Sequence, residues 1–270
     1  MGFKDLLSGS VPEHQLSALT GHYDVIGSVA IIVIPPALEE YKFVVADALL
    51  SHRHSIKTVL NKVAPVNGES RTARYEILAG NETVTTCREY GFLYELDLLT
   101  SFFNPGLSSE HKRVTDLVRP DERVLVPFSG VGPFVIPAAW RGAVVVAVEK
   151  NPDAFRWLCK NVHKNGVDGR VAPVHGNAFD TSLISGPAFD RIIIPTPYGM
   201  DAILDVLSPL AKPGGMIHFY TFRNKREIKE LTDRFCRTGY EAVRIRRCGN
   251  VAPGVARWVF DLKRSSCGSG

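Results

Sequence analysis

The sequence predicts an α/β fold class, with a doubly wound parallel sheet and a smaller α+β region before it. From residue 124 onward, short continuous apolar runs alternate with segments of helical periodicity, the pattern of a parallel sheet covered on both faces. A glycine-rich turn follows the first of these runs. With 270 residues, of which 45% are hydrophobic and 22% charged, the chain is long and apolar enough to bury a substantial core.

The first hundred residues predict a small mixed unit. Residues 23–34 favour two short strands around Gly27, and two prolines at 35–36 end the second one. Apolar residues at helical spacing predict a helix over 38–50. Further strands are predicted at 58–63, 83–88 and 92–99.

The remaining residues alternate between the two kinds of element. Ser108 is a suitable N-cap for a helix over 108–118. Strands are predicted at 124–126, 143–148, 171–174, 191–194, 216–220 and 255–262, and helices at 135–140, 152–165, 200–210 and 227–238. We therefore expect an N-terminal segment (1–22), a small α+β domain (23–100), a larger domain (101–264) and a disordered tail (265–270).

Composition restricts the classes of protein. The five cysteines are widely spaced and show no zinc-ligand pattern, which indicates a reducing, cytoplasmic location and no metal site. No apolar run approaches the roughly 20 residues that a membrane span needs, and no secretion signal is visible. The net charge of +4 is compatible with nucleic acid as a partner.

The strongest local motif is FSGVGPF at 128–134, between a predicted strand and a predicted helix. Gly130 and Gly132 let the backbone approach a ligand closely, although the same glycines are also compatible with a plain structural turn. Glu149 ends the next strand about 20 residues downstream, where an acid can bind ribose hydroxyls. Asn177 and Ala178 follow the third strand, at a position that frames an adenine. Because the last glycine of GxGxxG is missing, the motif favours an adenosine without a pyrophosphate.

The motif and its surroundings resemble a known family. Residues 128–134, 149–154 and 158–165 are similar to the S-adenosylmethionine-dependent enzymes that modify guanosine-37 of tRNA, namely guanine-N1 methyltransferases and wybutosine-pathway aminocarboxypropyl transferases. The resemblance extends to residues 23–27, 57–63, 74–80, 88–91 and 252–256. It implies a Rossmann-like, class I methyltransferase domain at 101–264 and an RNA-contacting domain at 23–100.

Site residues follow from this resemblance. It implies S-adenosylmethionine as cofactor, with Glu149 on the ribose and Asn177 and Ala178 on the adenine. His111 stands where the family has a basic residue near the cofactor; a solvated position on its helix is the alternative. The complete expected set of cofactor-binding residues is His111, Phe128, Gly130, Gly132, Glu149, Lys150, Asn177, Ala178 and Pro195.

The chain also departs from the family pattern. Asn104-Pro105-Gly106-Leu107 replaces Ser-Pro-Arg-Leu, so the catalytic arginine of the methyltransferases is missing. Tyr198 and Thr196, in the proline-rich loop after the fourth strand of the larger domain, are expected to orient the target base, or else to form a rigid turn. The expected catalytic residues are Tyr198, Thr196 and Asn104, and the expected RNA-binding residues are Lys57, Lys62, Arg71 and Arg74.

Three functions remain open from the sequence. Guanine-N1 methyl transfer to tRNA is the main expectation. Aminocarboxypropyl transfer in the wybutosine pathway is the first alternative, because Gly106 is closer to that branch. A tRNA-binding paralogue without catalysis is the second. In each case we expect the anticodon loop region of tRNA as the partner. The sequence leaves the oligomeric state open and is compatible with a monomer.

Overall fold

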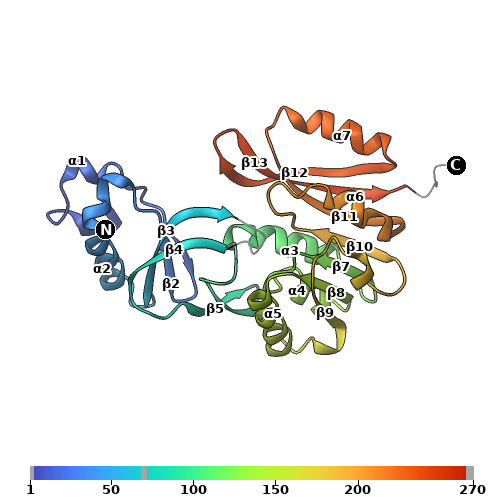
Figure 1. Cartoon of the computed structure of the whole chain (residues 1–270), viewed down its shortest axis with the longest axis horizontal. Helices are drawn as coiled ribbons and strands as arrows, with labels where there is room; N and C mark the ends of the chain where they lie inside the picture. Colours follow the sequence, from blue (N-terminus) through green and yellow to red (C-terminus); the bar gives the residue numbers. More distant parts are fainter. Residues whose placement is uncertain (1–2, 68–71, 266–270) are drawn as a thin grey trace. The chain divides into compact units, whose positions relative to one another are not determined.

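The computed structural model describes residues 3–67 and 72–265 and divides the chain into two compact units, Met1–Pro105 and Gly106–Gly270 (Figure 1). The sequence places the corresponding boundary between residues 100 and 101. Of the expected tail, residues 266–270 lie outside the described residues, as does Arg71.

The first unit is built on a four-stranded sheet with the order β1-β2-β3-β4. Its strands are β1 (Asp24–Ile26), β2 (Val29–Ile32), β3 (Thr58–Asn67) and β4 (Thr72–Ala79). The helix α2 (Lys42–His52) joins β2 to β3, which run parallel. A separate hairpin follows, made of β5 (Val84–Glu89) and β6 (Phe92–Asp97). The sequence did not predict β4.

The turn between β1 and β2 shows why a glycine is needed there. Gly27 has φ +57°, and a Cβ at this position would lie 2.1 Å from the Thr85 side chain of β5. The amide of Ser28 donates to the Thr85 hydroxyl at 2.9 Å. The turn is therefore fixed against the β5–β6 hairpin.

The N-terminal residues belong to the core of the first unit. The 3-10 helix η1 (Phe3–Leu7) and the short α1 (Glu13–Leu16) bury Phe3, Leu7 and Leu16 in one cluster with strand and helix residues of the unit. A second 3-10 helix, η2 (Pro36–Tyr41), leads into α2 and buries Leu38. Residues 3–22 thus pack on the small unit as part of it.

The second unit contains a seven-stranded sheet with the order β12-β13-β11-β10-β7-β8-β9. Its parallel strands are β7 (Arg123–Pro127), β8 (Val144–Glu149), β9 (Val171–His175), β10 (Phe189–Ile194) and β11 (Ala211–Arg223). The antiparallel hairpin of β12 (Tyr240–Ala252) and β13 (Val255–Arg264) completes it. The predicted doubly wound α/β class is confirmed. The chain reverses its direction of winding between β7 and β10.

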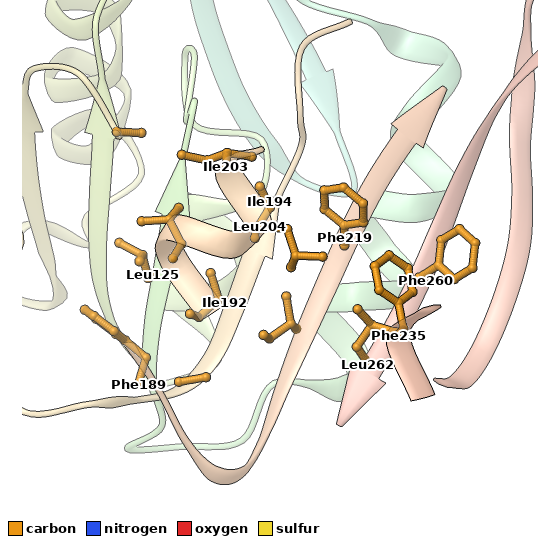
Figure 2. Packing of buried hydrophobic residues seen from close by; sticks show 14 of the residues in the cluster. Leu125, Phe189, Ile192, Ile194, Ile203, Leu204, Phe219, Phe235, Phe260 and Leu262 are labelled. Carbon is orange, nitrogen blue, oxygen red and sulfur yellow. The ribbon is translucent and has the colours of Figure 1, made fainter. Parts of the chain in front are cut away.

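Helices cover both faces of this sheet. The connecting helices are α3 (Ser108–Leu117), α4 (Val135–Trp140), α5 (Pro152–Lys164), α6 (Ile203–Leu207) and α7 (Glu227–Arg237), with short 3-10 turns η3 (Pro105–Leu107), η4 (Asp168–Arg170), η5 (Thr181–Leu183) and η6 (Ser208–Leu210). Phe219 of β11 and Phe260 of β13 pack on Phe235 of α7 (Figure 2). Their neighbours His218 and Asp261 point to the opposite face, where Arg113 of α3 meets Asp261, because successive strand residues alternate.

Candidate functional site

The glycine-rich loop after β7 has an unusual backbone. Phe128, Gly130 and Gly132 all have positive φ, at +51°, +56° and +103°. The left-handed region is costly for a phenylalanine, and such strain concentrates at ligand sites. The Ser129 amide donates to the Val148 carbonyl at 3.1 Å, while the buried Ser129 hydroxyl has no hydrogen-bond partner in the described part of the chain. A strained loop with an unsatisfied polar atom fits a bound ligand.

Glu149 ties this loop to the start of α5. One carboxylate oxygen accepts the Gly130 amide at 2.7 Å, and the other accepts the Asn151 amide at 2.8 Å. A carboxylate offers about four acceptor positions, so two backbone amides leave capacity for two ribose hydroxyls. The half-buried Glu149 is therefore held in one orientation and still has lone pairs for a ligand.

Two asparagines, one that caps α5 and one within it, lie close to the same loop. Asn151 caps the helix, its side-chain oxygen accepting the Asp153 amide at 3.0 Å. Fully buried Asn161 donates to the Val131 carbonyl at 3.1 Å. Sequence reasoning gave neither residue a role, although both lie in the segments that carry the family resemblance.

The loop after β9 lies next to Glu149. The Gly176 amide donates to the Glu149 carbonyl at 2.9 Å, and the exposed Asn177 turns its side-chain oxygen to the Phe179 amide at 3.1 Å. Ala178 is buried, whereas the Phe179 ring is partly exposed, 6.5 Å from the Phe128 ring in an edge-on arrangement. Two aromatic edges and the Asn177 amide thus frame the place where the sequence predicts an adenine.

Other predicted cofactor residues have different surroundings. The Lys150 side chain is exposed, and its carbonyl contacts the His175 ring at 3.2 Å. His111 is buried at 3% exposure, with its ring 4.6 Å from the ring of Phe134, at the end of the glycine-rich loop. The alternative of a solvated histidine is wrong, because His111 lies on the buried side of α3.

The loop after β10 separates its two candidate catalytic residues. Thr196 is buried, and its hydroxyl donates to the Ile194 carbonyl at 3.2 Å, which holds that hydroxyl in a local turn beside the half-buried Pro195. Tyr198 is 72% exposed, with its ring 5.5 Å from that of Phe222 on β11. Of the two, Tyr198 has the exposed aromatic surface that stacking on a base requires.

The carboxylate of Asp201, three residues after Tyr198, already has hydrogen-bond and ion-pair partners. Asp201 accepts the Thr221 hydroxyl at 2.8 Å and forms a short ion pair with Arg223. An ion-paired carboxylate is a poor general base, because its negative charge is already compensated. The geometry thus gives Asp201 a structural role at the end of β11.

A buried polar network lies between α3 and the sheet, and sequence reasoning missed it. Arg113 binds Asp261 through two nitrogens, at 2.7 and 3.2 Å, and donates to buried Glu110 at 3.0 Å. Asp261 also accepts from His218 at 2.6 Å, while Arg191 donates to the other ring nitrogen at 2.6 Å. Burial lowers the pKa of His218, and an arginine can only donate; His218 is therefore neutral, with its proton on the nitrogen that faces Asp261.

The network extends to the end of the glycine-rich loop. The Tyr220 hydroxyl donates to Glu110 at 3.1 Å, and the Tyr220 ring lies 5.6 Å from that of Phe134. On the far side, Arg246 of β12 contacts the second Glu110 oxygen at 2.9 Å. Burial, followed by the charge of Glu110, raises the pKa of Tyr220 well above its usual value, so its hydroxyl remains protonated.

The predicted RNA-binding residues that are described belong to the first unit. Lys57 is exposed and pairs with Glu82 at 3.4 Å, Lys62 is half-buried, and Arg74 is exposed. Asn104, expected to be catalytic, is half-buried at the end of this unit.

Two absences concern the described residues alone. Within 3–67 and 72–265, no group of three or more histidine, cysteine, aspartate or glutamate side chains is arranged to hold a metal ion. No helix in that part of the chain has the length and apolar character to cross a membrane.

Comparison with known families identifies the family of the chain. Residues 85–245 match the family described as TRM5/TYW2 methyltransferase domain, and residues 3–83 match TYW2 N-terminal domain. The chain belongs to the TRM5/TYW2 family. The predicted family is thereby confirmed, and S-adenosylmethionine is confirmed as the cofactor on which this family depends.

Relatives of both activities are similar to the chain. A tRNA(Phe) (4-demethylwyosine(37)-C(7)) aminocarboxypropyltransferase of Pyrococcus horikoshii is 31% identical over 96% of the chain and 95% of its own length. The tRNA (guanine(37)-N(1))-methyltransferase Trm5b of Pyrococcus abyssi is 32% identical over 84% of the chain and 70% of its own length. The chain spans only 39% of the methyltransferase of Danio rerio, at 33% identity.

Solved structures agree with the fold. The crystal structure of P. horikoshii TYW2 in complex with MeSAdo has a TM-score of 0.81 and 28% identity, covering 98% of both chains. The complex of aTrm5 and tRNALeu has a TM-score of 0.87 and 25% identity, covering 98% of this chain and 78% of the other. The family is therefore one of S-adenosylmethionine-dependent transferases that modify tRNA at position 37.

Proposed function

We propose that this chain transfers the aminocarboxypropyl group of S-adenosylmethionine to the base at position 37 of a tRNA. The observation that carries the proposal is the full-length match to aminocarboxypropyltransferases. The P. horikoshii relative is covered over 95% of its length and that of Methanocaldococcus jannaschii over 97%. The first unit also matches the N-terminal domain named for TYW2.

Guanine-N1 methyl transfer is the second candidate and stays the prediction made from the sequence. Its support is the 32% identity to P. abyssi Trm5b and the TM-score of 0.87 to aTrm5. Against it stands Gly106, at the position where the resemblance places the catalytic arginine of the methyltransferases. A chain without that arginine fits the other transfer better.

The residues of the glycine-rich loop fit the cofactor. S-adenosylmethionine supplies carbon atoms made electrophilic by a neighbouring sulfonium. In this proposal Glu149 binds the ribose hydroxyls with its free lone pairs, and Asn177 and Ala178 contact the adenine. The positive φ angles of Gly130 and Gly132 favour glycine at both positions, and a Cβ on Gly132 would lie 3.0 Å from the Leu158 side chain. Held in this way, the reactive carbon has a fixed direction of approach, and positioning of this kind supplies much of the rate in such a site.

The target base belongs at the loop after β10. Tyr198 offers an exposed ring beside Phe222, at the carboxyl edge of the sheet where open α/β folds bind ligands. We assign to Lys57, Lys62 and Arg74 of the first unit the contacts with RNA phosphates, which supply affinity without sequence information.

Transfer of two differently labelled cofactors tests the proposal. Unmodified tRNA and tRNA carrying the tricyclic precursor base are each incubated with S-adenosylmethionine labelled either in the methyl group or in the carboxyl carbon. We expect only the carboxyl label to enter RNA, and only with the precursor base. Entry of the methyl label alone would assign methyl transfer instead. No label in either RNA, together with no heat of S-adenosylmethionine binding in calorimetry, would indicate the tRNA-binding paralogue.

A further inference from the structure

The end of the β12–β13 hairpin encloses a hollow of about 750 Å³ that no step of the proposed function uses. Its lining residues follow the end of β11 or belong to β12, β13 and the turn between them. Figure 1 shows β12 and β13 as neighbouring strands. Its walls come from residues 224–225, 247, 250–256 and 258, all within the second unit.

The polar groups of this hollow suit an anion. Lys225 and Arg247 contribute positive charge, Asn224 and Asn250 contribute amides, and none of the residues that line it is acidic. Arg247 donates to the Asn250 side chain in a short hydrogen bond, which fixes the direction of its guanidinium group. Neither Lys225 nor Arg247 forms an ion pair with any carboxylate in the described ranges, so both retain their charge for a ligand.

An aromatic wall accompanies these charges. The Trp258 indole N–H donates to the Arg223 carbonyl at 3.2 Å, so the ring is held in one orientation. A fixed aromatic face beside cations is the combination with which proteins bind the bases and phosphates of single-stranded nucleic acid.

The hollow is connected to the loop that carries Tyr198. Trp258 bonds to the backbone of Arg223, and the Arg223 side chain pairs with Asp201, three residues after Tyr198. The preceding residue, Phe222, packs on the Tyr198 ring at 5.5 Å. The exposed ring of Tyr198 and the half-buried ring of Trp258 therefore contact consecutive residues, Phe222 and Arg223, at the end of β11.

From this arrangement we propose that the hollow binds a nucleotide adjacent to the modified one in the RNA chain. Its base stacks on Trp258, and its phosphate contacts Lys225 and Arg247. The inference rests on the proposed function, because it requires an RNA substrate. It adds a second RNA-binding position that is built from the hairpin and distinct from the first unit.

Charge removal with a matched control tests the phosphate contacts. The double variant Lys225→Ala/Arg247→Ala is compared with Lys229→Ala/Arg237→Ala, which removes the same charge from exposed positions of α7. For the first variant we expect tRNA binding at least ten-fold weaker and a slope of log affinity against log salt lower by about 1.4, at roughly 0.7 per contact. The control keeps the slope of the wild type, and both variants keep its affinity for S-adenosylmethionine.

Variants of the aromatic wall test stacking. We expect Trp258→Ala to weaken tRNA binding by about five- to a hundred-fold and Trp258→Phe to restore most of it, because stacking survives without the indole N–H. A protein with Trp258 as its single tryptophan should change its emission when RNA is added. If Trp258→Ala fails to fold, the charge variants and the emission of the single-tryptophan protein still test whether the hollow binds RNA.

The outcomes separate the inference from the proposed function. Unchanged tRNA affinity and salt slope in Lys225→Ala/Arg247→Ala, with transfer to tRNA intact in the wild type, would overturn the inference alone. Absence of any transfer by the wild type would overturn the proposed function. The measurements of tRNA affinity and salt slope would still test whether the hollow binds RNA. Weaker binding of an acidic peptide, but not of RNA, in the charge variant would also reject the inference.

Discussion

Asp261→Asn is the change that most directly tests the buried network beneath α3. Asp261 is 3% exposed and accepts two hydrogen bonds from Arg113 and one from His218. An asparagine of nearly the same shape keeps the packing but removes the negative charge. Arg113 then retains Glu110 alone as a carboxylate partner, in a site largely closed to water.

The size of the effect follows from the ionisation of Asp261. Burial by itself raises the pKa of the Asp261 carboxyl group. The hydrogen bond from His218, followed by the hydrogen bonds and the positive charge of Arg113, outweighs burial and lowers this pKa from the usual 3.8 to about 2. At about 1.36 kcal/mol per unit, this difference corresponds to roughly 2–3 kcal/mol. Removal of one partner of a buried ion pair costs roughly 3–5 kcal/mol. We expect a loss near 3 kcal/mol at pH 7.

Tryptophan fluorescence during urea unfolding measures this loss for the second unit alone. The three tryptophans, Trp140, Trp157 and Trp258, all lie in Gly106–Gly270. The matched control is Asp116→Asn, which breaks the half-exposed pair of Asp116 with Lys112 on the same helix. Such surface pairs contribute about 0–1 kcal/mol, so the control should unfold close to the wild type.

The pH dependence gives a second criterion. Because the folded-state pKa of Asp261 is depressed, its contribution is complete above about pH 4 and disappears as the pH falls toward 2. The stability difference between wild type and Asp261→Asn should therefore be constant from pH 7 to 5 and shrink below pH 4. A difference under about 1 kcal/mol at pH 7, or one that stays constant down to pH 3, would refute the assignment of this network as a stabilising element.

Three further predictions concern the site and its surroundings. Glu149→Gln should weaken S-adenosylmethionine binding by about ten- to a hundred-fold in calorimetry, because hydrogen bonds to a charged acceptor are lost; unchanged affinity would remove Glu149 from the site. Tyr198→Ala should lower the single-turnover rate with little change in cofactor affinity, whereas Tyr198→Phe should keep most of the rate; full activity of the alanine variant would exclude stacking by Tyr198. Burial raises the pKa of Cys248 to about 12, so peptide mapping after alkylation at pH 8 should show Cys248 modified far more slowly than the exposed Cys236, and equal rates would contradict this burial.

The glycine-rich loop and Glu149 were predictable because their signals are local. A strand, a turn with glycines and a helix follow one another within residues 123–140, and the acid ends the next strand. The parallel direction of the strands β7 to β11 follows from the same alternation of strands and helices. Each of these features depends on neighbours in the sequence, which is the information that periodicity and spacing contain.

The buried network was not predictable in this way. Arg113 and Asp261 are separated by 148 positions, and each alone has the pattern of an ordinary surface charge. Only the pairing of β11 with β13 places His218 opposite Asp261. Likewise β12 was missed, because its residues are mostly exposed and rich in arginine, whereas sequence patterns detect strands by their apolar content.

At the carboxyl edge of the large sheet, the exposed polar groups differ on the two sides of the point where the direction of winding reverses. On the side of β7 to β9, the Glu149 carboxylate accepts the neutral amides of Gly130 and Asn151 and forms no ion pair within residues 3–67 and 72–265, so its negative charge remains available to hydroxyl donors. On the side of β10 and β11, Asp201 is neutralised by Arg223, and the groups left exposed are Tyr198 and the cations beside Trp258. An uncompensated carboxylate would repel RNA phosphates, whereas an ion-paired one does not. In the proposed function, this separation means that a single edge binds a ribose through an acid and a polyanion through arginine, lysine and aromatic rings.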